Sequence, residues 1–464
     1  MKLADLYPRL PGPLQTLGLN VHAWRIHRER FGWPFRIELE RFLDRERRPL
    51  DSIRAYQAER LRELIAHAYE TVPYYRERMD ALSLKPGDIR SVEDLPKLPL
   101  LRRDTVRVEL PRLLSRSFTA RQRIHGHTSG TTGTPLEVYW DQRTCIINNV
   151  VDWRQKTWAG MKYGDPYAVL FGRMVVPTAQ KKPPFWRMNY LHNQLWLSTF
   201  HMSPANLEAY VGKLRSFGPV AIEGYPSTLF ILALHLIHKR QTLPLRAALT
   251  TSETLYPEQR DTIERAFACR VFDFYGQAER VVFATECERH EGHHPNLDYG
   301  VLEVVNDRGE PVREGELGWI VGTSLHNHAM PLLRYVTSDV TRLRLKPCSC
   351  GRSFPVMDDV TTKAEDIVVT KDGRFISPST LTHPFKELEN VVVSQILQET
   401  PEELIVRIVR AKDYDERQAG RLTEALQQRV GEDMRVTIQY VSEIERTAAG
   451  KFKWVISKVP LELD

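Results

Sequence analysis

Short apolar runs alternate with helix-like segments between residues 124 and 302, and this alternation constrains the fold more than any other feature of the chain. The strand candidates are short and apolar, and the helix candidates between them are longer: strands at 168–171, 220–222, 247–249 and 270–274, and helices at 207–217 and 257–267. Strands and helices in alternation build a parallel sheet with helices on its faces. We therefore expect an α/β fold for this part of the chain.

The pattern changes on both sides of this region. Residues 38–81 carry apolar side chains at helical spacing, with a break at Val72-Pro73. Later segments are mostly strand-like, with one helix near the end: strands at 301–305, 318–323, 332–336, 342–345, 391–398, 403–409 and 435–440, a strand with a hairpin turn at 366–374, and a helix at 414–430. We expect a helical extension over 1–100, a large domain with a small β-rich subdomain over 101–363, and a small α+β domain over 364–464.

Composition excludes several classes of protein. The 464 residues include 65 Lys and Arg and 59 Asp and Glu, so the net charge of +6 does not demand a nucleic-acid partner. Five cysteines, an odd number, exclude a disulfide scaffold and suit a reducing compartment. No run approaches the roughly 18 apolar residues of a membrane span, and the N-terminus has no apolar signal core. We expect a soluble cytoplasmic protein without a transmembrane segment.

Tryptophan and phenylalanine are interleaved with arginine between residues 24 and 35. This pattern is typical of an amphipathic helix packed on its own domain. A helix lying at a membrane surface has the same pattern.

A stretch rich in glycine and hydroxyl groups occupies residues 127–135 (His-Thr-Ser-Gly-Thr-Thr-Gly-Thr-Pro). Glycine lets backbone N–H groups converge on an anion, and the hydroxyls add donors, so the stretch suits a triphosphate. It does not match the GxxxxGK[ST] pattern of P-loop NTPases, which is absent from the chain. Taken alone, a stretch of this kind is more often a surface turn.

Three further motifs follow in order at residues 274–279 (Phe-Tyr-Gly-Gln-Ala-Glu), 334–339 (Arg-Tyr-Val-Thr-Ser-Asp) and 446–451 (Arg-Thr-Ala-Ala-Gly-Lys). In the first, an aromatic ring can stack on a purine and a carboxylate can hold Mg²⁺ on phosphate oxygens. In the second, a carboxylate can clamp a ribose diol. In the third, a lysine on a glycine turn can reach a site on another domain. Singly, each also fits a buried tyrosine, a solvated acid or a surface lysine.

The order of these four motifs resembles the adenylate-forming superfamily, and within it the phenylacetate–CoA ligase family. Residues 66–76 and 95–99 are similar to the first helix and linker of that family, and residues 177–202 are similar to a branch named after capsule-biosynthesis genes. The resemblance implies a large adenylate-forming domain with a mobile C-terminal lid domain. It also implies that a small-molecule carboxylate attacks the α-phosphate of ATP, giving an acyl-adenylate and pyrophosphate, and that coenzyme A then captures the acyl group.

The resemblance also implies roles for individual residues. The phosphates of ATP would lie on Thr128, Ser129, Gly130, Thr131, Thr132 and Gly133; the adenine side on Ser252, Glu253, Thr254, Tyr275, Gly276 and Gln277; the ribose on Asp339 and Lys363; Mg²⁺ on Glu279; and the acyl group against Tyr225. Lys451 would bridge the substrate carboxylate and the α-phosphate, which makes Lys451, Glu279 and Thr128 the expected catalytic residues. A monomer or a homodimer is expected.

Two positions depart from the family pattern. Thr362-Lys363 replaces the usual Gly-Arg of the hinge, and lysine lacks the planar fork of arginine. Thr134 stands where many relatives have lysine, which removes one charge from the phosphate loop.

The cysteines suggest a structural zinc site. Cys287 is followed by His293 and His294, and Cys348 and Cys350 form a Cys-x-Cys pair. Three sulfurs and one nitrogen make a tetrahedral zinc set. The resemblance places the nitrogen ligand at His294, with His293 as the alternative, and two unrelated cysteine clusters would give the same spacing.

Two other functions fit the same motifs. An amide-forming ligase would pass the adenylated acyl group to an amine. A non-catalytic nucleotide-binding relative would lack turnover, which the altered hinge at Thr362-Lys363 favours and the presence of Glu279, Asp339 and Lys451 disfavours.

Overall fold

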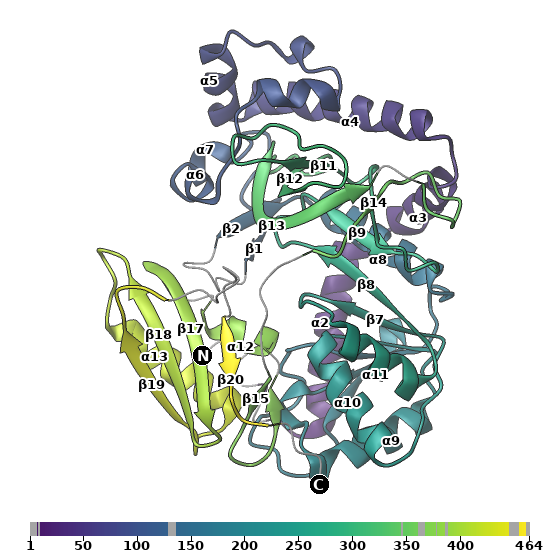
Figure 1. Ribbon diagram of the computed structural model, residues 1–464, viewed down its shortest axis with the longest axis vertical. Coiled ribbons are helices and arrows are strands. Elements are labelled where there is room, and N and C mark those ends of the chain that lie inside the picture. The colour runs from purple at the N-terminus through teal and green to yellow at the C-terminus, as the bar shows by residue number, and fades with distance from the viewer. Residues whose placement is uncertain are drawn as a thin grey trace.

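A computed structural model describes residues 7, 10–128, 136–344, 347–360, 367–376, 378–385, 388–444 and 454–460. A twelve-stranded sheet organises the larger part of the protein, and a four-stranded sheet near the C-terminus organises the smaller part. Figure 1 shows the smaller sheet beside the larger unit, with the N-terminal helices α4 and α5 at the top. No helix in the described ranges has both the length and the apolar character needed to cross a membrane.

The parallel half of the large sheet confirms the predicted strand–helix alternation. Its order is β8-β7-β6-β3-β5, with β4 antiparallel at the edge: β3 (Tyr167–Leu170), β4 (Trp186–Asn189), β5 (Gln194–Leu197), β6 (Ala221–Gly224), β7 (Ala247–Thr251) and β8 (Arg270–Gly276). Neighbouring residues of β7 point to opposite faces, so Ala247 and Leu249 enter one core and Ala248 enters the other.

Helices cover both faces of this sheet. One face is covered by three helices that follow strands along the chain: α9 (Pro204–Phe217), α10 (Pro226–His238) and α11 (Pro257–Phe267). Two short helices, η4 (Tyr190–His192) and η5 (Thr199–His201), precede them in the sequence. The opposite core contains side chains of α3 (Pro34–Arg45) and α8 (Gln142–Trp158), and α2 (Gly12–Arg30) packs beside α8 and the edge strand β4. Because both faces are covered, most side chains of these strands are buried, although the strands also carry charged residues such as Glu223 and Asp273.

The other half of the large sheet is antiparallel. Its strands are β9 (Phe283–Glu286), β10 (His293–Pro295), β11 (Gly300–Val305), β12 (Leu317–Ser324), β13 (Tyr335–Arg344) and β14 (Val356–Met357). The prediction of two separate strands at 332–336 and 342–345 was wrong, because β13 is continuous. Residues 335–336 and 340–342 pair with β12, and the polar residues 337–339 between them lie at an irregularity opposite the step from Trp319 to Val321. Threonine and valine favour strands, so the polar interval does not interrupt this one.

The N-terminal region is helical, as predicted. Helix α4 (Leu50–Thr71) ends just before the predicted break, and α5 (Pro73–Ala81) begins at the proline. Short elements then lead to a two-stranded ribbon: η2 (Pro86–Asp88), η3 (Val92–Lys97), α6 (Arg103–Val108), α7 (Leu110–Leu113), β1 (Ile124–His127) and β2 (Glu137–Trp140). Apolar side chains of α4, α5, the ribbon and β12 share one core.

The C-terminal unit is a small α+β structure. Strands β17 (Val391–Thr400) and β18 (Glu403–Arg410) form an antiparallel hairpin, and β20 (Val455–Ser457) and β19 (Arg435–Tyr440) run parallel to them at the two edges. Helix α13 (Arg417–Val430) connects β18 to β19, and α12 (Pro378–Phe385) packs in the same core around the buried Trp454. The predicted strands and helix of this region are confirmed within a few residues.

A small hairpin joins the two units. In β15 (Val368–Val369), which pairs with β16 (Phe375–Ile376), Val368 lies in the C-terminal core and Val369 in the core of the large sheet. Arg374 donates hydrogen bonds to the carbonyl of Phe200 at 2.8 Å and to that of Val430 at 2.7 Å. The predicted boundary at 363/364 lies outside the described residues and stays a prediction.

Candidate active site

The predicted nucleotide residues follow three adjacent parallel strands. Strands β6, β7 and β8 pair side by side, and their carboxyl ends are followed by Tyr225, Ser252 and Gln277. Ligands of open α/β sheets bind at this edge. In the turn after β7, Ser252 adopts a left-handed backbone conformation with a φ of 73°. The carboxylate of Glu253, the next residue, accepts a hydrogen bond of 3.1 Å from the backbone N–H of Ser227. The strand order therefore gathers these segments at one edge.

Two of the predicted motifs meet directly. The hydroxyl of Tyr275, on β8, donates a hydrogen bond of 2.7 Å to Oδ2 of Asp339, on β13. The side chain of Gln277 donates to the same hydroxyl at 2.7 Å, and its own oxygen accepts from the backbone N–H of Val282. Burial, together with the Asp339 carboxylate, raises the pKa of Tyr275 well above its usual value. Tyr275 is therefore a neutral donor that orients Asp339.

A second pair of predicted residues is joined by an arginine. Arg103 donates to the hydroxyl of Thr128 at 2.8 Å and lies 3.8 Å from Oε1 of Glu279. That hydroxyl also accepts from the backbone N–H of Leu136, across the phosphate stretch, and Tyr335 donates to Glu279 at 2.7 Å. Thr128 and Glu279 are both almost fully buried. One cation thus links the base of the phosphate stretch to the expected magnesium ligand.

Arg103 was not among the predicted site residues. It begins α6, which follows the leucine–proline linker at 95–99 and has no glycine-rich or acidic signature of its own. The only available signal was a pair of arginines, Arg102 and Arg103, at the start of a short helix.

Several predicted residues lie outside the part of the chain that the structure describes: Ser129, Gly130, Thr131, Thr132, Gly133, Lys363 and Lys451. Their roles stay predictions. The flanks of the phosphate stretch are described, because β1 ends at His127 and the backbone N–H of Thr128 donates to the carbonyl of Leu136 at 3.0 Å.

Tyr225, the predicted wall of the acyl pocket, directly follows β6. It precedes α10, is 8% exposed, and packs edge-to-face on Phe171 with ring centroids 5.1 Å apart. Burial raises the pKa of its hydroxyl to about 12. Nearby, the buried hydroxyl of Ser227 has no hydrogen-bond partner among the described residues. The region therefore offers an aromatic wall and an unsatisfied hydroxyl.

The predicted zinc residues form one cluster. The side-chain ligand atoms of Cys287, His294, Cys348 and Cys350 all lie within 4.8 Å of one another. The sulfurs of Cys287 and Cys348 are 3.7 Å apart, and the sulfur of Cys350 is 3.6 Å from Nε2 of His294. A tetrahedron with metal–sulfur bonds of about 2.3 Å has edges of nearly this length. The donor set and its spacing fit zinc.

The surroundings of the cluster support a metal. Nδ1 of His294 lies 3.1 Å from the carbonyl of Pro355, which fixes the proton there and leaves Nε2 free to act as a ligand. Burial raises the pKa of Cys287, and raises that of Cys348 to about 11. Burial also opposes ionisation of Cys350, but its contact with His294 and a hydrogen bond from the Arg352 amide lower its pKa to about 6. A dication would compensate all three thiolates.

His293 lies outside this cluster. Because neighbouring residues of a strand face opposite sides, His293 points away from the cysteines and contacts Asp273 at 3.1 Å and Asp359 at 3.3 Å. Burial opposes protonation, but these carboxylates raise the pKa of His293 to about 10. The geometry therefore favours His294 over His293 as the nitrogen ligand.

Comparison with known proteins identifies the family. The chain is 30% identical over 335 residues to a phenylacetate–coenzyme A ligase of Thermus thermophilus, which is 70% of this chain and 73% of that ligase. The chain belongs to the phenylacetate–coenzyme A ligase family. It is also 24% identical to the protein CapK of Staphylococcus aureus over 98% of this chain and 99% of CapK, and residues 368–458 match the family described as the CapK C-terminal domain. The predicted resemblance is confirmed.

Comparison with solved structures confirms the fold predicted for this chain. A 2-hydroxyisobutyryl-CoA ligase in complex with 2-HIB-AMP and CoA gives a TM-score of 0.60 at 20% identity, covering 89% of this chain and 91% of that one. The same ligase in the postadenylation state gives 0.56 at 19% identity. The chain therefore has the adenylate-forming fold, as predicted.

Proposed function

We propose that this protein activates a carboxylic acid with ATP to an acyl-adenylate, releases pyrophosphate, and transfers the acyl group to coenzyme A. Membership of the phenylacetate–coenzyme A ligase family supports the reaction class. The single observation that carries the proposal is the meeting of four predicted residues in two linked pairs, Tyr275 with Asp339 and Thr128 with Glu279 through Arg103. Each pair brings together motifs that are distant in the sequence.

On the basis of these contacts, we assign a part of ATP to each pair. Asp339, oriented by Tyr275, would accept hydrogen bonds from the ribose hydroxyls, and the Tyr275 ring would face the adenine. Thr128 and Arg103 would bind the phosphates that the glycine-rich stretch surrounds. Charge then builds at the α-phosphate during adenylation, and fixed donors stabilise it without reorganising. Lys451, assigned by the family pattern, would supply the charge that bridges the reacting carboxylate and phosphate.

Two metals complete the proposal. The Glu279 carboxylate would hold Mg²⁺, which neutralises phosphate oxygens, with Arg103 as its countercharge when the ion is absent. Zinc on Cys287, His294, Cys348 and Cys350 would be structural, because four protein ligands leave no open position. We place the enzyme in the reducing cytoplasm, where free thiolates persist.

The acyl acceptor can be tested directly. Purified protein is incubated with ATP, Mg²⁺ and a panel of aromatic and aliphatic acids, with coenzyme A in one series and amines in another, and products are identified by mass spectrometry. The proposal predicts acyl-CoA for at least one acid. Amide products without thioester would establish the amide ligase instead. AMP release that yields neither a thioester nor an amide in any series would contradict both.

A further inference from the structure

A second group of potential metal ligands lies on the face of β10 that is turned away from the cysteines. Glu286 of β9 and His293 of β10 pair directly across the two strands, and His293 also pairs with Met357 of β14. Asp359 follows Met357 by two residues. The ligand atoms of Glu286, His293 and Asp359 all lie within 4.8 Å of one another, and we call these three residues the carboxylate–histidine group. The strand register therefore brings together three potential ligands.

His293 presents one ring nitrogen to this group. Its Nε2 donates to Oδ2 of Asp273 at 3.1 Å, and Oδ1 of Asp273 accepts from the hydroxyl of Thr250 at 2.6 Å. The side chain of His293 is 3% exposed, and its Nδ1 makes no hydrogen bond of good geometry in the described ranges, although Oδ1 of Asp359 lies 3.3 Å away. Metal-binding histidines are held in this way, because their second ring nitrogen donates to a carboxylate that is itself hydrogen-bonded. His293 is therefore oriented to bind an ion through Nδ1.

His290 offers a second buried imidazole beside the group. Its side chain is 7% exposed, and neither ring nitrogen makes a hydrogen bond of good geometry in the part of the chain that the structure describes. Nδ1 of this ring lies 3.5 Å from Oε2 of Glu286. Burying a polar group without a partner costs free energy, and a ligand that binds it removes this cost. An ion held by the group would be such a ligand.

The group carries an excess of negative charge. Asp273, Glu286 and Asp359 supply three carboxylates, and the guanidinium of Arg260, 2.6 Å from Glu286, is the arginine paired with them in the described ranges. With the imidazoles neutral, two negative charges are uncompensated, which matches the charge of one dication. Such an ion would replace the proton that the carboxylates otherwise hold on His293.

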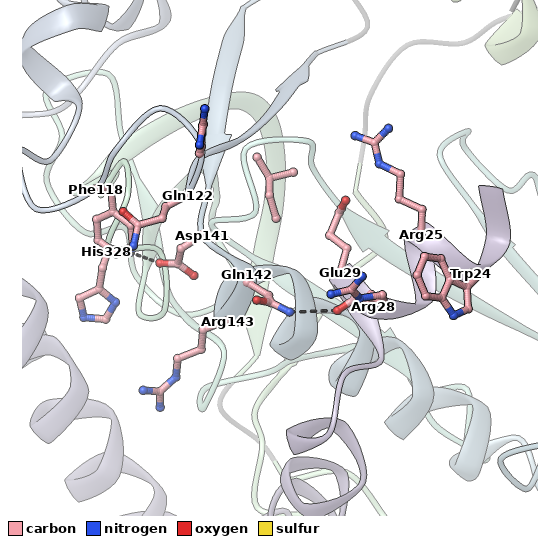
Figure 2. Close-up of a pocket in the computed structure, with 12 residues that line it drawn as sticks. Trp24, Arg25, Arg28, Glu29, Phe118, Gln122, Asp141, Gln142, Arg143 and His328 are labelled. Atoms are coloured by element: carbon pink, nitrogen blue, oxygen red, sulfur yellow. Dashed lines mark hydrogen bonds between the residues drawn. The ribbon is translucent and has the colours of Figure 1, made fainter. Parts of the chain in front are cut away.

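A basic cavity elsewhere in the protein repels cations. Figure 2 shows Arg25 and Arg28 on one side of this cavity of about 650 Å³ and Arg143 on the other. Asp141, an acid of its lining, is engaged by a hydrogen bond of 3.0 Å from the backbone N–H of His328. Because like charges repel, an added dication would collect at the carboxylate–histidine group rather than in this cavity.

We propose that the carboxylate–histidine group binds a divalent transition-metal ion through Nδ1 of His293 and the carboxylates of Glu286 and Asp359, with His290 as the nearest additional donor. Imidazole and carboxylate ligands suit such ions, whereas the thiolates on the opposite face select zinc. Asp359 is 78% exposed, so the ion can exchange with solvent and is expected to be lost during purification. When bound, it would tie the segment after β14 to β9 and β10.

Cobalt titration distinguishes this site from the predicted zinc site. Co²⁺ is added to protein dialysed to one zinc per chain, and binding is followed by the visible absorption of the ion. Thiolate ligands would add intense charge-transfer bands in the ultraviolet, which nitrogen and oxygen ligands do not give. Wild type should bind one equivalent of Co²⁺ without these bands. Asp359→Asn, which changes an exposed side chain and should leave the fold intact, is expected to bind Co²⁺ at least about tenfold more weakly.

The adjacent acid provides a matched control. Asp358 is paired with Arg344 at 2.8 Å and lies outside the group, so Asp358→Asn should bind Co²⁺ like wild type. Saturating Co²⁺ should also raise the Tm of wild type and of Asp358→Asn more than that of Asp359→Asn. Absence of Co²⁺ binding to wild type, thiolate bands on binding, or equal Co²⁺ affinities in the two variants would overturn the proposal.

Discussion

The hydroxyl of Tyr275 and the carboxylate of Asp339 are 64 residues apart in the sequence and 2.7 Å apart in the structure. Strand β8 carries the tyrosine and β13 the aspartate, so the contact bridges the parallel and antiparallel halves of the large sheet. A shift of either half would break this hydrogen bond. The proposed ribose contact therefore depends on the packing of the two halves.

Replacing the ribose carboxylate should weaken ATP binding. Asp339→Asn keeps the shape but loses the charge, and a hydrogen bond to a charged group contributes about 1.5–3 kcal/mol, so KM for ATP should rise about 10- to 100-fold. Tyr275→Phe keeps the ring and loses only the orienting hydroxyl, so its effect should be smaller. Steady-state kinetics with varied ATP measure both. A larger loss in Tyr275→Phe than in Asp339→Asn would contradict this order of roles.

Arg103 should act in the adenylation step. Arg103→Lys keeps the charge but cannot make both the Thr128 and Glu279 contacts with a planar fork. We expect kcat of adenylation to fall roughly 10-fold in Arg103→Lys and about 100-fold in Arg103→Ala. The neighbouring exposed Arg102→Ala is the matched control and should stay near wild type. Equal activity in Arg103→Ala and Arg102→Ala would remove Arg103 from the site.

Zinc should be bound and should stabilise the large domain. Metal analysis of freshly purified protein should find one zinc per chain, and Cys350→Ser should lower this content while Cys269→Ser, a cysteine outside the cluster, should not. Chelators should lower the Tm of wild type, because metal binding contributes to folding. Wild-type protein that is free of zinc and insensitive to chelators would refute the site.

His326 should contribute to acid sensitivity. Burial lowers its pKa to about 4, against about 6.5 in an unfolded chain. Between these values the unfolded chain takes up a proton that the folded protein does not, so stability falls as pH drops from about 6.5 to 4, by about 3 kcal/mol at most. Above pH 6.5 this contribution is constant.

Denaturant unfolding at a series of pH values measures the effect. The slope below pH 6.5 should be shallower in His326→Gln than in wild type, whatever the loss of stability at pH 8. His238→Gln, which changes an exposed histidine, should keep the wild-type slope. Identical slopes in all three proteins would show that His326 takes up its proton equally in both states.

The lysine of the last motif should separate the two half-reactions. Lys451→Ala should abolish adenylation, because its charge acts while charge builds at the α-phosphate. It should still convert supplied acyl-adenylate and coenzyme A to thioester. Lys458→Ala, in the same terminal segment, serves as the control. Equal loss of both half-reactions in Lys451→Ala would remove this role.

The sequence predicted the strand ends and motif residues because both depend on local pattern. Alternation located β6, β7 and β8, and the motifs at their ends supplied Tyr225, Ser252 and Tyr275. Arg103 could not be found in this way, because its role arises only where the fold brings it to both Thr128, just after β1, and Glu279, just after β8. The choice between His293 and His294 also needed the structure. The two side chains lie on opposite faces of β10, and only the structure shows which face is turned toward the cysteines.

ATP–pyrophosphate exchange without any acyl acceptor tests the central claim most directly. Wild-type protein is incubated with ATP, Mg²⁺, labelled pyrophosphate and each acid of a broad panel, and label entering ATP is measured. We predict exchange that requires an acid and that Asp339→Asn strongly reduces at limiting ATP. Exchange with none of the acids, or exchange that is independent of acid, would contradict the assignment of this site to carboxylate adenylation.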